Sequence, residues 1–96
     1  MAQQLIQIKI MTPQQVVFNG PALSLSSKNT DGKFDIIAQH ANFITIVEDQ
    51  PIDIIQPDKR KISFNFNLAI IHNASNIVSV FANILGSQNQ KPPPKK

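Results

Sequence analysis

Apolar and polar residues alternate with a period of two along most of this chain. Ile6, Ile8 and Ile10 are separated by Gln7 and Lys9, which places the three isoleucine side chains on one face of an extended strand. Further apolar segments that fit strands lie at residues 16–18, 23–26, 34–37, 44–46, 52–55, 62–68 and 77–82. Because isoleucine and valine favour pleated strands, the pattern predicts about nine short strands.

Residues 62–68 carry the longest regular alternation. Ile62, Phe64, Phe66 and Leu68 alternate with polar residues, so we expect all four to share the core-facing side of one strand. The phenylalanines are therefore predicted to be core residues and not a stacking surface for nucleic-acid bases.

Turn-forming residues separate the predicted strands at short intervals. They are Thr12-Pro13, Asn19-Gly20-Pro21, Asn29-Thr30-Asp31-Gly32, Gln39-His40-Ala41-Asn42, Asp49-Gln50-Pro51, Pro57-Asp58-Lys59 and the segment 73–76. Gly, Pro, Asn and Asp at such positions favour chain reversal. Short strands joined by regular turns, with no stretch of helical spacing between caps, predict an all-β sandwich or barrel.

The chain divides into one folded domain and a tail. The alternating pattern ends near Gly86, and we expect residues 1–86 to form a single β-domain. Residues 87–96 contain three consecutive prolines and three lysines. Because such a segment has little apolar surface to bury, we expect it to be a disordered tail.

The formal net charge of +3 comes from that tail. Lys91, Lys95 and Lys96 are three of the nine basic residues, so the other six basic residues match the six acidic ones. A domain without excess positive charge gives no support to nucleic-acid binding. Cysteine is absent from the sequence, which excludes disulfides and thiolate metal sites.

Residues suited to catalysis or metal binding are sparse. The two histidines, His40 and His72, lie in predicted turns or at strand ends. Asp31 and Asp35 precede His40, which leaves a His–carboxylate cluster as a minor alternative to a loop that hydrogen-bonds locally. The basic run Lys59-Arg60-Lys61 is interpreted as an exposed hairpin tip. The sequence thus predicts a non-catalytic interaction domain without a cofactor, a metal or a small-molecule substrate.

Two segments carry a resemblance to a known family. Residues 6–11 are followed by Thr12-Pro13 and by an apolar stretch that ends in Phe18-Asn19-Gly20. Further on, Asp31-Gly32-Lys33-Phe34-Asp35-Ile36-Ile37 is followed two residues later by His40-Ala41. In this order and spacing the chain resembles the N-terminal β-sandwich domain of the F-type ATP synthase epsilon subunit (delta/epsilon family), over roughly residues 5 to 85.

The resemblance implies a flattened β-sandwich of nine to ten strands and a non-catalytic role in the central stalk of the rotary ATP synthase. There the domain bridges the gamma subunit and the membrane rotor ring, so that proton translocation stays coupled to ATP synthesis. Carried onto this chain, the implied rotor-ring contacts are Thr30, Asp31, Gly32, Lys33 and His40, while no motif specifies the gamma contacts. The implied location is the cytoplasmic face of a bacterial cell membrane, reached indirectly through the complex.

Some residues depart from the family pattern. Asp35 replaces a glycine, and Ala38-Gln39 replaces the Pro-Gly pair that usually precedes His40. Lys33 stands where acidic residues are frequent, so basic loops on a rotor ring would repel it. Family members usually continue into a C-terminal helical hairpin that can inhibit ATP hydrolysis, and we expect none here because residues 87–96 are too few for two helices. The alternative function is a free-standing β-sandwich adaptor that binds another protein.

Overall fold

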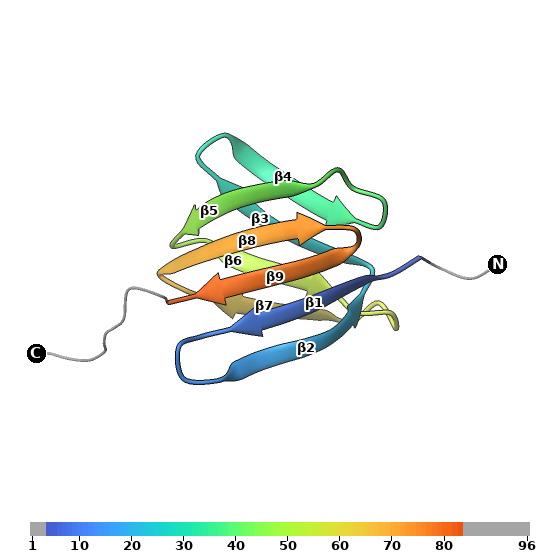
Figure 1. Ribbon diagram of the computed structural model, residues 1–96, viewed down its shortest axis with the longest axis horizontal. Coiled ribbons are helices and arrows are strands. Elements are labelled where there is room, and N and C mark those ends of the chain that lie inside the picture. The colour runs from blue at the N-terminus through green and yellow to red at the C-terminus, as the bar shows by residue number, and fades with distance from the viewer. Residues whose placement is uncertain (1–3, 84–96) are drawn as a thin grey trace, which may run out of the picture.

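Nine β-strands form the protein in a computed structural model that describes residues 4–83 (Figure 1). Their bounds are β1 (Ile6–Met11), β2 (Val16–Ala22), β3 (Ser24–Asn29), β4 (Gly32–Ile37), β5 (Phe43–Glu48), β6 (Pro51–Ile55), β7 (Lys61–Asn65), β8 (Leu68–Ala74) and β9 (Ile77–Ala82). The predicted domain end at residue 86, the tail at 87–96 and the predicted lack of a helical hairpin lie outside the described residues. Within residues 4–83, no helix has the length and hydrophobicity needed to cross a membrane.

The strands form two sheets that stack on each other. A five-stranded sheet has the order β2-β1-β9-β8-β5, and a four-stranded sheet has the order β4-β3-β6-β7. Figure 1 shows the five-stranded sheet in front of the four-stranded one. The β1–β9 pair is parallel, and the other strand pairs of the described region are antiparallel. The prediction of an all-β sandwich with nine to ten strands is confirmed.

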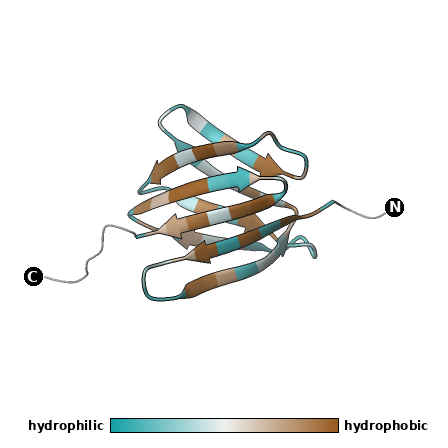
Figure 2. Ribbon diagram, in the orientation of Figure 1, coloured by the Kyte–Doolittle hydropathy of each residue, from teal (hydrophilic) through white to brown (hydrophobic). Residues whose placement is uncertain are grey.

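The core is a layer of aliphatic side chains between the two sheets. Ile6, Ile8 and Ile10 on β1 are at most 1% exposed, as the period-two pattern predicts. The other buried apolar residues are Ala22, Leu25, Ile36, Val47, Ile52, Ile54, Ala69, Ile71, Val78, Val80 and Ala82. Figure 2 shows the resulting alternation of hydrophobic and hydrophilic segments along β1. Burial of each large aliphatic side chain stabilises the fold by about 1.5–3 kcal/mol.

The predicted single strand over residues 62–68 is wrong. β7 ends at Asn65, and β8 begins at Leu68 in the other sheet. The chain therefore changes sheets at residues 66 and 67. Phe64 and Phe66 nonetheless pack against the core with their rings parallel, 6.0 Å apart. Their predicted core role is confirmed, although they do not belong to one strand.

The predicted turn at Asn19-Gly20-Pro21 is also wrong, because these residues lie inside β2. Pro21 has no backbone N–H and cannot donate to a neighbouring strand. It is tolerated because β2 is the edge strand of its sheet, so one side of its backbone has no partner strand in the described fold. The chain bends after Ala22, where β2 ends and β3 follows at Ser24.

We predict that truncating a core isoleucine unfolds the protein far more easily than truncating an outward-facing one. Ile8→Ala removes a side chain that is 0% exposed and should lower the free energy of unfolding by about 2–5 kcal/mol. Ile44→Ala makes the same chemical change at a side chain that is 67% exposed and should stay within about 0.5 kcal/mol of the parent. Urea denaturation followed by circular dichroism measures both values. Equal losses would contradict the assignment of the two faces.

Candidate functional site

The tip of the β3–β4 hairpin consists of Thr30, Asp31, Gly32 and Lys33. The Asp31 backbone N–H donates to Oδ1 of Asn29 over 2.8 Å, a local turn that Asn side chains favour. Gly32 has a φ of +122°, which a residue with a side chain adopts only under strain, although a Cβ there would meet nothing within 4 Å. The side chains of Thr30, Asp31 and Lys33 are exposed. The sequence therefore builds a projecting tip whose shape depends on a glycine.

A hydrogen bond between the two sheets ties this tip to β5. Nδ2 of Asn29 donates to Oγ1 of Thr45 over 2.9 Å. β5 is the edge strand of the five-stranded sheet, and β4 is the edge strand of the four-stranded sheet. In Figure 1 the two strands lie on the same side of the sandwich. We call this side, together with the hairpin tip and the β4–β5 loop, the β4–β5 edge.

His40 lies in the β4–β5 loop, at the opposite end of β4 from the hairpin tip. The six residues of β4 separate the two by about 17 Å at 3.4 Å per residue. The imidazole is half-buried, donates from Nδ1 to the Ala41 carbonyl oxygen over 2.8 Å, and packs edge-on against Phe43 with ring centroids 5.6 Å apart. The structure thus places the five predicted residues along one edge but does not gather them into one cluster.

Hydrogen bonds between the β4–β5 loop and the β8–β9 hairpin hold the conformation of the loop. Gln39 has a φ of +71°, in the left-handed region where glycine is favoured. Its backbone N–H donates to Oδ1 of Asn76 over 2.7 Å, and the Ser75 N–H donates to Oδ1 of Asn42 over 3.3 Å. These contacts offset the backbone strain of Gln39, which stands where the family pattern has a glycine.

An apolar row crosses the outer face of the five-stranded sheet, and the alternation of residues did not predict it. Successive cross-strand partners build the row, one from each strand, and they are Val16, Met11, Phe81, Ile70 and Ile46. Ile44 on β5 extends it on the same face and is 67% exposed, while Ile77 lies on that face at the other end of β9. A signal was present at residues 43–47, where apolar residues occupy both strand faces. Because both faces of this segment carry apolar residues, the pattern did not separate the outward isoleucines of β5 from the core.

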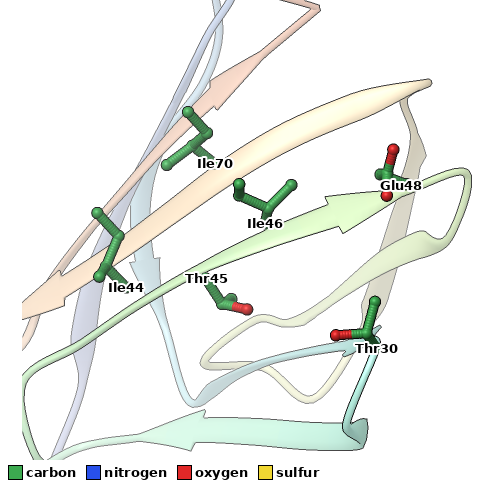
Figure 3. Close-up of a pocket in the computed structure, with 6 residues that line it drawn as sticks. All are labelled: Thr30, Ile44, Thr45, Ile46, Glu48 and Ile70. Atoms are coloured by element: carbon green, nitrogen blue, oxygen red, sulfur yellow. The ribbon is translucent and has the colours of Figure 1, made fainter.

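A groove joins this apolar row to the hairpin tip. It has a volume of about 540 Å³ and is lined by Thr30, Ile44, Thr45, Ile46, Glu48 and Ile70. Figure 3 shows Ile44 and Ile46 on β5 beside Ile70 on β8, with Glu48 towards one end and Thr30 on the neighbouring hairpin. An open apolar groove with one carboxylate at its end is suited to protein side chains more than to reaction chemistry.

The outer face of the four-stranded sheet is mainly polar, although Ile37 at the end of β4 is 55% exposed there. Side chains from its four strands form a hydroxyl–carboxylate row across it, in the order Asp35, Ser26, Asp53 and Ser63. Ser26 donates from Oγ to Oδ1 of Asp35, and Ser63 donates to Oδ1 of Asp53. The two outer faces of the sandwich therefore differ, since only the five-stranded sheet presents an apolar row.

The alternative cluster of Asp31, Asp35 and His40 does not form. Asp35 is bonded to Ser26 on the polar face, and His40 lies beyond the far end of β4. Over residues 4–83, no three His, Asp or Glu side chains are placed to share a metal ion. The run from Lys59 to Lys61 is exposed at the β6–β7 turn, where Arg60 Nε forms an ion pair with Asp58 at 3.0 Å. Its prediction as a hairpin tip is confirmed.

The fold is a two-sheet β-sandwich with an exposed apolar row on one outer face, and such rows are typical of surfaces that bind proteins. Residues 5–85 match the family described as "ATP synthase, Delta/Epsilon chain, beta-sandwich domain". The chain belongs to this family.

Curated relatives agree with that assignment. The ATP synthase epsilon chain of Sulfurimonas denitrificans is 35% identical over 66 residues, which cover 69% of this chain and 51% of the relative. The epsilon chain of Protochlamydia amoebophila is 28% identical over 83 residues, 86% of this chain and 56% of the relative. The chain thus spans about half the length of these relatives.

Two solved structures share the fold. A chain of the Euglena gracilis mitochondrial ATP synthase superposes with a TM-score of 0.75 at 12% identity, covering 85% of this chain and 52% of the other. A chain from the central stalk and c-ring structure of the Tetrahymena thermophila mitochondrial ATP synthase gives 0.67 at 11% identity, covering 85% and 66%. At such low identity the agreement concerns the fold alone.

We predict that Lys33→Glu stabilises the isolated protein. Lys33 lies directly opposite Lys28 across the β3–β4 hairpin, and like charges in such pairs are destabilising. The substitution replaces repulsion by attraction and should raise the free energy of unfolding by about 0.2–1 kcal/mol at low salt, and by less at high salt.

The matched control is Lys9→Glu, which changes the net charge equally. The cross-strand partners of Lys9 are Asn19 and Ser79, both uncharged. Urea denaturation at two salt concentrations compares the variants. Indistinguishable effects would show that net charge, and not the Lys28–Lys33 pair, controls the stability of the hairpin.

Proposed function

We propose that this chain is the β-sandwich of a non-catalytic epsilon subunit in the central stalk of a bacterial F-type ATP synthase. The observation that carries the proposal is the apolar row on one outer face, found in a chain whose residues 5–85 match the delta/epsilon family. The proposed task is mechanical. The sandwich bridges the gamma subunit and the rotor ring, so that proton translocation stays coupled to ATP synthesis.

The outer face of the five-stranded sheet is the proposed gamma-facing surface. Ile44 and Ile46 are 67% and 54% exposed, and an apolar row of this extent is stabilised when a partner protein covers it. The groove between β5, β8 and the hairpin tip supplies a recess for partner side chains. The polar row on the four-stranded sheet makes the opposite face a poor candidate for a dry interface.

The β4–β5 edge is the proposed rotor-ring contact. It carries Thr30, Asp31, Gly32 and Lys33 at one end and His40 at the other. A ring surface that lies along β4 would meet both ends, about 17 Å apart. The exposed Lys33 and Asp31 are the charged groups that would face the polar loops of the ring. This edge adjoins the gamma-facing surface at β5, as a bridging domain requires.

The proposed location is the cytoplasmic face of the cell membrane, with the protein held there through the synthase complex. The curated relatives come from bacteria, which supports this location. Because the sandwich core is a continuous aliphatic layer, the domain would transmit torque as a stiff body.

The proposal is tested by isolating the tagged protein from the membranes of its own organism. We predict that gamma, alpha, beta and rotor-ring subunits co-purify with it. With the double variant Ile44→Lys, Ile46→Lys, the amount of gamma that co-purifies should fall about tenfold or more, because lysines replace apolar groups in the interface. Both positions are exposed on an edge strand, so the fold should tolerate the lysines.

The control carries the same charges on the opposite face, at Ser63 and Asn65 of β7. This Ser63→Lys, Asn65→Lys variant should recover the synthase subunits as the parent does. A folded and abundant protein that recovers none of these subunits would contradict the proposal and favour the adaptor function.

A further inference from the structure

Asn73 is an unusual residue for the interior of a β-sandwich. It lies on β8 between Phe43 of β5 and Val78 of β9, its cross-strand partners, and it is 1% exposed. The sequence pattern places it in a turn, whereas the structure extends β8 through it to Ala74. With Ser27, it is one of two polar residues buried in the described region.

The amide of Asn73 bonds to the β4–β5 loop. Nδ2 donates to the Ala41 carbonyl oxygen over 3.0 Å and, over a longer 3.4 Å, to the His40 carbonyl oxygen. Oδ1 of the same side chain has no hydrogen-bond partner among residues 4–83. A buried acceptor without a partner lowers the stability of the fold. The hydrogen bonds that this buried amide makes are both with the loop.

We propose that Asn73 is a positioning residue that fixes the β4–β5 loop and thereby the orientation of His40. The loop contains the strained Gln39, so its backbone conformation has to be stabilised by contacts with neighbouring elements. Asn76 holds the Gln39 N–H, and Asn73 holds the two carbonyl groups that follow. The link to the rotor ring rests on the proposed function, since it takes His40 as part of the ring contact.

A valine at position 73 separates this role from a role in stability. Valine favours a strand, fits between Phe43 and Val78 as an apolar residue, and removes the unpaired Oδ1. It also removes the donor to the loop. We expect Asn73→Val to melt at the same temperature as the parent or higher, while the loop opens more often.

Hydrogen exchange of individual amides measures the opening. The His40 N–H is bonded to the Ile37 carbonyl oxygen at 3.2 Å, and the Gln39 N–H to Asn76. In Asn73→Val these two amides should exchange about five- to tenfold faster, the change expected from the loss of about one net hydrogen bond. The Val80 amide in β9 should exchange as in the parent. The control Asn65→Val, on an exposed face of β7, should change none of the three.

Recovery of the rotor-ring subunits from membranes is the second readout. We expect Asn73→Val to recover several-fold less of them than the parent. Unchanged exchange at Gln39 and His40, or a large fall in melting temperature, would overturn the positioning role. Faster loop exchange with unchanged ring recovery would overturn the link to the ring. If the parent itself recovers no synthase subunits, the proposed function and the link to the ring are both contradicted. The exchange rates of Gln39 and His40 still test separately whether Asn73 holds the loop.

Discussion

The aliphatic layer between the two sheets is the interaction on which the rest of the structure depends. Ile6, Ile8 and Ile10 of β1 belong to one buried cluster with Leu25 of β3, Ile36 of β4 and the isoleucines of β6, and this cluster fixes which side of each strand faces inward. Because side chains alternate along a strand, that choice also fixes which residues face outward. The parallel pairing of β1 with β9 places the first and last strands side by side in the centre of one sheet.

The two outer faces that follow from this core have different chemistry. Across the five-stranded sheet, Ile46, Ile70 and Phe81 face outward as neighbours. Across the four-stranded sheet, serine hydroxyls and aspartate carboxylates bond to one another. A small domain of this kind would lose little by leaving the polar face in water, whereas covering the apolar face would be favourable. The proposed place between a stalk subunit and a ring uses this difference, together with the projecting tip at Gly32.

The fold was largely predictable from the sequence, because in a two-layer sandwich every second residue of a strand faces the core. The pattern failed where tertiary structure overrides local preference. Pro21 reads as a turn, but an edge strand tolerates it. Residues 43–47 are apolar on both faces, so their spacing does not tell the core side from the interface side. The sequence pattern predicts a turn at Asn73, and only the packing of β8 against the β4–β5 loop shows that this residue is buried. The order of residues 29–41 indicated that the hairpin tip and His40 are candidate contact residues. Only the structure shows that they lie at opposite ends of β4.

We propose that a stalk partner covers the apolar face while the β4–β5 edge meets the rotor ring. A cryo-electron microscopy structure of the ATP synthase purified from the source organism would show both contacts. We expect density for this sandwich at the foot of the central stalk, with Ile44, Ile46 and Ile70 buried against gamma and the tip at Thr30 to Lys33 near the ring. A purified synthase with no density for this chain, or with the apolar face open to solvent and the polar face against gamma, would contradict it.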